Sequence, residues 1–209
     1  MSITTSFRRL LAAYLLTSLL LANTNTSAAE NATYDVVVYG GTSAGIATAI
    51  QVKRMGGSVV VIEPTNRIGG LTTGGLGQTD IGNKAAIGGV SREFYARVRK
   101  HYDDETNWRW QAKQDYRSDG QSITRANEET MWTFEPSAAL SILQDWVAEL
   151  DIPVVTGQRL DRTPLGDDTK RVVGVEMNGA RIVAMTMESG DRFAGKRFVD
   201  ATYEGDLLA

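Results

Sequence analysis

Residues 36–45 read VVVYGGTSAG, in which a run of β-branched and aromatic residues leads directly into a glycine-rich turn. The apolar run over residues 34–39 predicts a strand that is buried on both faces of a sheet. The fingerprint of dinucleotide-binding turns is G-x-G-x-x-G. Gly40 and Gly45 fill its outer positions, while Thr42 takes the middle one. The stretch therefore predicts either a phosphate-binding turn or an ordinary glycine-rich turn between a strand and a helix.

The residues after this turn complete a strand–helix–strand unit. Residues 44–55, AGIATAIQVKRM, predict a helix that ends at two glycines, and residues 58–62, SVVVI, predict a second buried strand. Two parallel strands joined by a helix within about thirty residues form a βαβ unit. The sequence thus predicts an α/β, Rossmann-like fold, in which the helix N-terminus directs free N–H groups and a positive dipole end at a phosphate.

Two side chains bear on whether this turn binds a nucleotide. Thr42 crowds the place where a glycine would let phosphate approach the backbone, but its hydroxyl and that of Ser43 are suited to donate to a phosphate oxygen. Glu63 ends the second strand about twenty residues after the turn, where an acidic side chain accepts hydrogen bonds from ribose hydroxyls. Its charge also disfavours the 2′-phosphate of NADP. Glu63 therefore favours the phosphate-binding interpretation.

The rest of the chain extends this α/β pattern. We expect a long glycine-rich loop, an irregular insert or lid, two further helices, a third strand and an antiparallel β-meander that ends in a return strand. The expected ranges are loop 65–89, helix 90–102, insert 103–133, helix 136–150, strand 152–156, meander segments 171–177, 181–188 and 192–202, and return strand 197–201. The domain would then comprise residues 34–102 and 134–209, with residues 103–133 inserted.

Four motifs in the same order resemble the FAD-dependent oxidoreductase family, of the two-dinucleotide-binding-domain flavoprotein type. They are YGGTSAGIATAI, RIGGLTTGGLGQTD, FEPSAAL and FVDATYEGDLLA. Threonine at the middle position of the turn is familiar in that family, and the similarity covers residues 34–209 apart from 103–133. The family's FAD domain continues beyond the point where this sequence stops, so we expect a domain truncated at its C-terminal end.

The resemblance implies that FAD binds in an extended form along a defined set of residues. The pyrophosphate would meet Gly40, Gly41, Thr42, Ser43, Ala44 and Gly45, and Glu63 would bind the adenosine ribose. Arg67, Gly69, Gly70, Leu71 and Thr72 would lie along the pyrophosphate and ribityl chain, and Gly74, Gly75, Leu76 and Gly77 would approach the flavin ring. Leu160 would lie near the adenine, and Ala201 and Thr202 would return the last strand to the cofactor.

The function implied is that of an exported FAD-dependent oxidoreductase, in which FAD takes a hydride from a small-molecule or carbohydrate-like substrate. Two alternatives stay open: a non-catalytic nucleotide-binding fragment of such an enzyme, and an NAD-dependent dehydrogenase. Asp80, Arg92 and His101 are conceivable catalytic groups, but each is equally well explained as an ordinary loop or helix residue. The sequence therefore names no catalytic residue, and it is silent on oligomeric state.

The composition excludes several other classes of protein. The 209 residues carry a formal net charge of −3, which argues against a nucleic-acid-binding protein. No cysteine and one histidine are present, so a cysteine nucleophile, a disulfide framework and a cysteine-based zinc site are excluded, and no metal site is expected. A Ser-His-Asp triad would have to use His101, which lies in the charged run VRKHYDDE.

The N-terminus has the pattern of a secretory signal peptide over residues 1–29. Arg8 and Arg9 precede an apolar run of about thirteen residues, which is shorter than the ~20 residues needed to span a bilayer. Small residues follow, so we expect cleavage near Ala28 or Ala29 and a periplasmic or secreted mature chain without a membrane span. The arginine pair leaves the twin-arginine route open beside the general secretory route.

Overall fold

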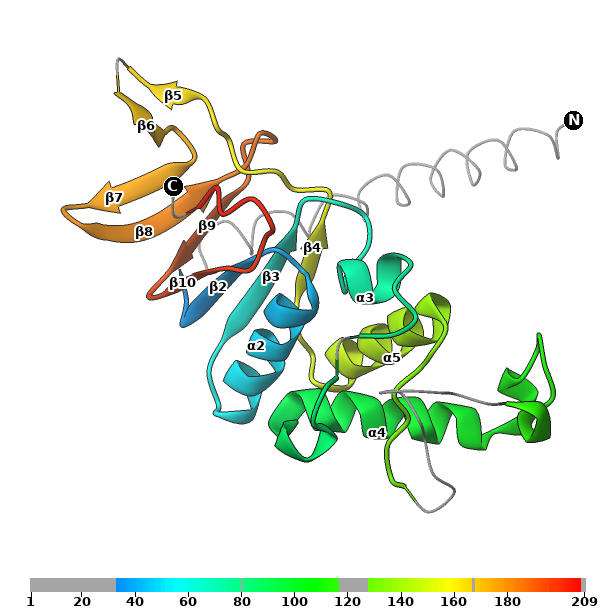
Figure 1. The fold of residues 1–209 in the computed structure, drawn as a ribbon. Coiled ribbons are helices and arrows are strands. Elements are labelled where there is room, and N and C mark those ends of the chain that lie inside the picture. The colour runs from blue at the N-terminus through cyan, green and yellow to red at the C-terminus, as the bar shows by residue number, and fades with distance from the viewer. Residues whose placement is uncertain (1–32, 80, 117–127, 167, 208–209) are drawn as a thin grey trace, which may run out of the picture. The chain divides into compact units, whose positions relative to one another are not determined.

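The computed structural model describes residues 33–79, 81–116, 128–166 and 168–207 (Figure 1). The predicted signal peptide, the candidate Asp80 and part of the predicted insert lie outside these residues. Residues 33–207 belong to one compact unit. Within the described part of the chain, no helix is both long enough and apolar enough to cross a membrane.

A four-stranded parallel sheet forms the centre of this unit, with the strand order β10-β2-β3-β4. Its strands are β2 (Val36–Tyr39), β3 (Val59–Glu63), β4 (Val154–Thr156) and β10 (Phe198–Asp200). The register pairs Val38 with Val61, and both side chains are fully buried. The predicted βαβ unit is confirmed, since helix α2 (Ser43–Arg54) connects the parallel strands β2 and β3.

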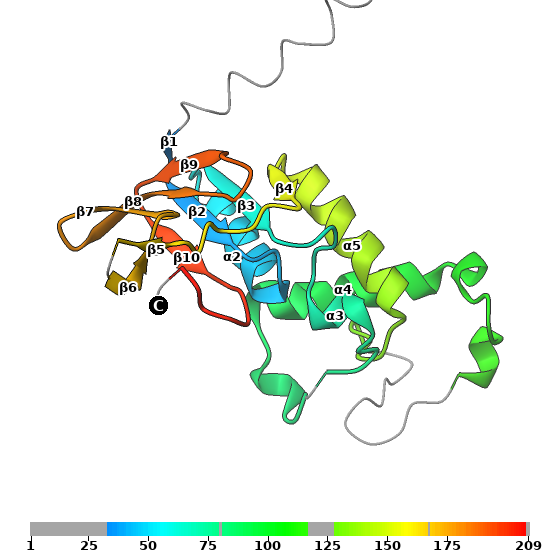
Figure 2. The ribbon, with the colours of Figure 1, turned by 90° about the horizontal axis from the view of Figure 1, so that it is seen from above.

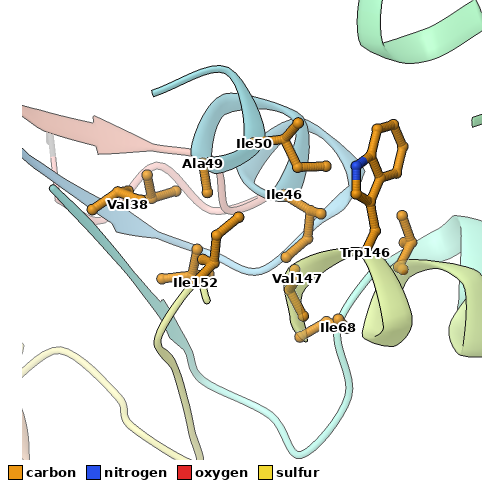
Figure 3. Packing of buried hydrophobic residues seen from close by; sticks show 11 residues of the cluster. Val38, Ile46, Ala49, Ile50, Ile68, Trp146, Val147 and Ile152 are labelled. Atoms are coloured by element: carbon orange, nitrogen blue, oxygen red, sulfur yellow. The ribbon is translucent and has the colours of Figure 1, made fainter. Parts of the chain in front are cut away.

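The two faces of the parallel sheet are covered by different kinds of structure (Figures 1 and 2). Val38 and Val61 pack with α2 and with helix α5 (Pro136–Glu149), which contributes Trp146 to the same cluster (Figure 3). On the other face Val37 and Val60 pack against side chains of the meander, including Met185 and Phe193. Successive side chains of each buried strand point to opposite faces of the sheet, so these strands join three layers: the helices, the parallel sheet and the meander.

The meander is a second sheet, with the order β1-β9-β8-β7. Its strands are β1 (Thr33–Tyr34), β7 (Val175–Asn178), β8 (Arg181–Thr186) and β9 (Arg192–Gly195), and a hairpin of β5 (Pro164–Leu165) and β6 (Asp168–Val172) precedes it. The prediction of one strand over 34–39 is wrong, because Tyr34 pairs with β9 whereas Val36 begins β2. Asp35 separates the two, since its carboxylate accepts from the Ser58 backbone N–H and hydroxyl and from Lys196 Nζ.

The segments expected to be irregular contain short helical turns. The loop 65–89 includes α3 (Leu71–Gly74) and a 3₁₀ turn (Lys84–Ala86), and two more 3₁₀ turns (Glu105–Asn107 and Lys113–Asp115) follow α4 (Gly89–Asp103). Met131 and Trp132, at the end of the predicted insert, are buried against Tyr95 and Tyr102 of α4. That end of the insert thus belongs to the hydrophobic core.

Candidate functional site

The turn between β2 and α2 is so tightly enclosed that only glycine fits at two of its positions. Gly40 has φ +99°, and a Cβ there would lie 2.7 Å from the carbonyl carbon of Ala201 and from the backbone nitrogen of Thr202. A Cβ at Gly45 would lie 1.9 Å from the carbonyl oxygen of Gly40. The end of β10 and the first turn of α2 therefore fix the path of the chain through this turn.

Thr42 holds the turn together through its hydroxyl. Its Oγ1 accepts a hydrogen bond from the backbone N–H of Gly45 (3.3 Å), which caps α2, and donates one to the carbonyl oxygen of Ala201 (2.8 Å). A hydroxyl has one hydrogen, and here that hydrogen is committed to Ala201. In this conformation the Thr42 hydroxyl therefore has a structural role, and its expected hydrogen bond to a phosphate stays a prediction.

The other hydroxyl of the turn is also engaged. Ser43 Oγ lies 3.0 Å from the carbonyl oxygen of Gly69 and 2.7 Å from Thr72 Oγ1. What α2 offers an anion is its backbone, because the first N–H groups of a helix have no intrahelical partner and Ser43 and Ala44 are exposed at this end.

Glu63 is a buried carboxylate at the end of β3 whose position is fixed by the backbone on both sides. Oε2 accepts from the Gly41 N–H (2.6 Å) and Oε1 accepts from the Thr65 N–H (2.7 Å), while only 6% of the residue is exposed. A Cβ at Gly41 would lie 3.1 Å from Oε2. Each carboxylate oxygen retains a lone pair after these bonds, so the group can also accept from ligand hydroxyls.

A cavity of about 400 Å³ lies at this junction, at the carboxyl ends of β2, β3 and β10. Ligands of open α/β sheets bind at this edge. The cavity brings together seven of the residues predicted from the sequence: Gly40, Thr42, Glu63, Arg67, Gly70, Leu160 and Thr202. Its wall also contains residues that the sequence analysis did not identify: Tyr39, Pro64, Thr65, Arg159, Arg162, Tyr203, Glu204 and Asp206.

Three of the additional lining residues place functional groups at the cavity. Arg159 is exposed, and Arg162 forms an ion pair with Asp206 (3.1 Å). The hydroxyl of Tyr203 accepts a hydrogen bond from the Leu71 N–H (2.9 Å), at the start of α3. The two arginines flank Leu160, so the prediction for Leu160 was the only sequence signal that pointed to them.

The remaining predicted residues divide into those that build the turn and those that lie outside the cavity wall. Ala201 belongs to the first group, since its N–H donates to the Tyr39 carbonyl (2.7 Å). Gly41, Ala44, Gly45 and Gly69 also build or adjoin the turn, and Ser43 and Thr72 line a separate small pocket beside α2. Leu71, Gly74, Gly75, Leu76 and Gly77 do not line the cavity.

Arg67 lines the cavity and also anchors helix α3. Its Nε donates to the carbonyl oxygen of Thr73 (2.9 Å), and its Nη2 donates to the same oxygen. Cations at the carboxyl end of a helix interact favourably with the last carbonyl groups, so Arg67 holds α3 beside the cavity.

The candidate catalytic residues that the structure describes lie away from this cavity. His101 is on α4 with its ring against Tyr102, and Arg92 donates to the carbonyl oxygens of Lys84 (3.2 Å) and Ile87 (3.3 Å). Neither lines the cavity. The structure does not describe Asp80, and the described residues contain no group of histidine and acidic side chains that could hold a metal ion.

Comparison with known proteins identifies the family but limits what can be transferred. Over 85% of its length the chain is similar to L-amino acid deaminase from Proteus vulgaris with its specific insertion sequence deleted, at 18% identity and a TM-score of 0.50. The flavin-containing monooxygenase of Stenotrophomonas maltophilia matches 81% of the chain at 16% identity and a TM-score of 0.45. The matches span 55% and 38% of those two proteins, respectively. At 18% identity, the match to the deaminase shows the fold alone. No curated protein sequence matches the chain.

The family model described as "FAD dependent oxidoreductase" matches residues 35–209, which include the turn, Glu63, strands β7, β8 and β9 of the meander, and β10. This match covers most of the chain, and membership of this family implies FAD as the cofactor. The chain belongs to the FAD-dependent oxidoreductase family.

Proposed function

We propose that this chain binds FAD in the cavity at the carboxyl ends of β2 and β3, and that it is part of an enzyme that oxidises a small organic molecule. The observation that carries the proposal is the buried Glu63 carboxylate, which two backbone N–H groups hold beside the start of α2. A buried, oriented acceptor next to a helix N-terminus fits a ligand with ribose hydroxyls close to a phosphate.

The residues of the cavity and of the adjoining turn divide the work of binding by their chemistry. The backbone N–H groups of Ser43 and Ala44, exposed residues at the start of α2 that do not line the cavity itself, suit the pyrophosphate. Glu63, in the cavity wall, suits the ribose of the adenosine. Leu160 offers a buried apolar contact for the adenine, with Arg159 and Arg162 beside it. When bound, FAD would accept the electrons from the substrate, and the protein would supply binding and orientation.

Measurement of bound nucleotide tests the proposal directly. The purified 209-residue chain should show a flavin absorption spectrum, and denaturation should release FAD. Protein that is folded but colourless, and that does not quench the fluorescence of added FAD, would contradict it. Release of NAD instead would favour the dehydrogenase alternative, and bound FAD without turnover on any electron acceptor would favour the non-catalytic fragment.

A matched pair of variants tests the role of Glu63. Glu63→Gln should weaken FAD binding at least tenfold, because hydrogen bonds to a charged group contribute about 1.5–3 kcal/mol. Glu105→Gln, at an exposed position of a 3₁₀ turn, is the control and should bind FAD unchanged. Thermal unfolding without FAD separates the two roles of Glu63, since loss of its backbone contacts would lower stability even in the absence of ligand.

We also infer that the mature protein acts outside the cytoplasm, because residues 1–29 have the charge, length and small-residue ending of a signal peptide. Cell fractionation after expression of the whole chain tests this inference. An N-terminus that begins near Glu30 in the exported fraction would support it, whereas an unprocessed cytoplasmic chain would contradict it.

A further inference from the structure

A second pocket, of about 210 Å³, lies between the end of α4 and the segments 107–116 and 131–135. It shares no lining residue with the cavity that contains Glu63. Its wall is attached to the glycine-rich segment, because the Phe134 N–H donates to the carbonyl oxygen of Gly77 (2.9 Å). A Cβ at Gly77 would lie 2.8 Å from the Phe134 carbonyl oxygen, so the two segments are in direct contact.

The aromatic floor of this pocket is held in place by its own hydrogen bonds. The Tyr102 hydroxyl donates to Glu135 Oε2 (3.1 Å) and accepts from the Glu135 N–H (2.9 Å). The indole N–H of Trp108 donates to the Tyr102 carbonyl (2.8 Å), and its ring packs between Tyr102 and Tyr116 at centroid distances of 5.1 and 5.3 Å. The pocket is therefore preformed, which lowers the cost of ordering side chains when a ligand binds.

The mouth of the pocket carries side chains that the fold does not use. Trp110 is 88% exposed, and it lies between Arg109 and Gln111, which are also exposed and also line the pocket. Among the residues that the structure describes, these three side chains have no hydrogen-bond or ion-pair partner. A large apolar surface, a guanidinium group and a carboxamide are thus available together at one opening.

These groups restrict the chemistry of a ligand that would satisfy all of them. Glu135 offers hydrogen-bond acceptors, Arg109 and the indole of Trp110 offer donors, and Gln111 offers both. A hydroxyl group can pair with each of them. Because Glu135 and Arg109 carry opposite charges, these two side chains together give no net charge that would select an anion or a cation. The aromatic faces in turn favour a ring with an apolar C–H face.

We propose that this pocket is a subsite for one polyhydroxylated, sugar-like ring of the substrate. The assignment as a substrate subsite rests on the proposed function: if FAD binds as proposed, residues 74–77 are expected beside the flavin ring, and Gly77 lines the pocket. Binding of a sugar ring to the pocket itself does not require FAD and can be measured separately.

Saturation-transfer difference NMR on the 209-residue chain tests the proposal. The probes are the methyl pyranosides of glucose, galactose and mannose, with benzoate and tetramethylammonium as charged comparisons. At least one pyranoside should receive saturation at its ring C–H protons and bind more tightly than both charged probes. Trp110→Ala should weaken that binding about tenfold, because it removes the large aromatic surface at the mouth of the pocket on which the C–H face of the ring would pack. Trp110→Phe should restore most of it.

Leu165→Ala is the matched control, because Leu165 is an exposed apolar residue of the β5–β6 hairpin and lines none of the three pockets described. FAD content is measured on the same samples. The subsite is overturned if the chain binds FAD but no pyranoside, or if Trp110→Ala leaves pyranoside binding unchanged. Either result leaves the proposed function standing. Pyranoside binding that depends on Trp110 in a chain unable to bind FAD supports the sugar-ring pocket while the proposed function fails. Preferential binding of benzoate or tetramethylammonium overturns the assignment of ligand class.

Discussion

Replacement of Thr42 by valine separates a structural role of its hydroxyl from a role in phosphate binding. Valine keeps the branched shape of the side chain but removes both hydrogen bonds, to the Gly45 N–H and to the Ala201 carbonyl. Loss of a helix N-cap costs about 1 kcal/mol. The abandoned Ala201 carbonyl adds at least about 1 kcal/mol, taken at the low end because Ala201 is only half-buried. The free energy of unfolding should therefore fall by about 2 kcal/mol.

Thermal unfolding in the absence of FAD is the assay for this prediction. For a chain of this size, 1 kcal/mol shifts the Tm by about 2–4 °C, so Thr42→Val should unfold about 4–8 °C lower. Thr42→Ser keeps the hydroxyl and is the control, with a much smaller shift. An unchanged Tm in Thr42→Val, combined with weaker FAD binding, would refute the structural role and return the hydroxyl to the phosphate.

Two further predictions concern packing and pH. Gly45→Ala should lower the free energy of unfolding by at least about 1–3 kcal/mol and abolish FAD binding, because its Cβ would overlap the Gly40 carbonyl oxygen. Gly88→Ala is the control, since the new Cβ there would lie in open space. Equal midpoints of denaturant unfolding for the two variants would contradict this prediction. Burial raises the pKa of Tyr102 to about 12. Because the folded pKa lies above the unfolded value of about 10, Tyr102 contributes stability that is complete below pH 10 and is lost between about pH 10 and 12. Tm values measured from pH 8 to 11.5 should fall more steeply in the native chain than in Tyr102→Phe, and parallel curves would count against this.

The parts of the fold that the sequence predicted are those in which local pattern and tertiary structure agree. The runs 37–39 and 59–62 are buried on both faces, and such strands are apolar without interruption. The split at Asp35 could not be predicted, because it depends on Ser58 and Lys196, which are distant in sequence. The short helix α3 was missed for a related reason, since a glycine-rich stretch has little helical propensity and Arg67 stabilises α3 from outside.

In the candidate site, too, the sequence predicted the residues with a local pattern and missed those that tertiary structure brings in. The spacing of Gly40, Gly45 and Glu63 predicted that they would lie together, because a βαβ unit brings the carboxyl ends of adjacent strands to one edge. Arg159 and Arg162 gave no comparable signal, since an arginine after a strand is usually an exposed residue. They reach the cavity because the chain after β4 is held against the meander, where Leu160 forms a β-bridge with Met187 and packs with Met185.

The hydrogen bonds of Thr42 explain why a threonine occupies the middle position of the turn, where the dinucleotide-binding fingerprint has a glycine. A glycine there would leave the Ala201 carbonyl without this partner and α2 without its cap, whereas the threonine hydroxyl satisfies both groups. Glu63 ties the same turn to β3 through the Gly41 N–H. Strands β2, β3 and β10 are thus joined at the turn by two side chains, and the groups of the turn that remain available to an anion are backbone N–H groups at the start of α2. Pyrophosphate binding should therefore depend on the path of the backbone more than on the hydroxyl of Thr42, and a substitution that preserves this path should preserve binding.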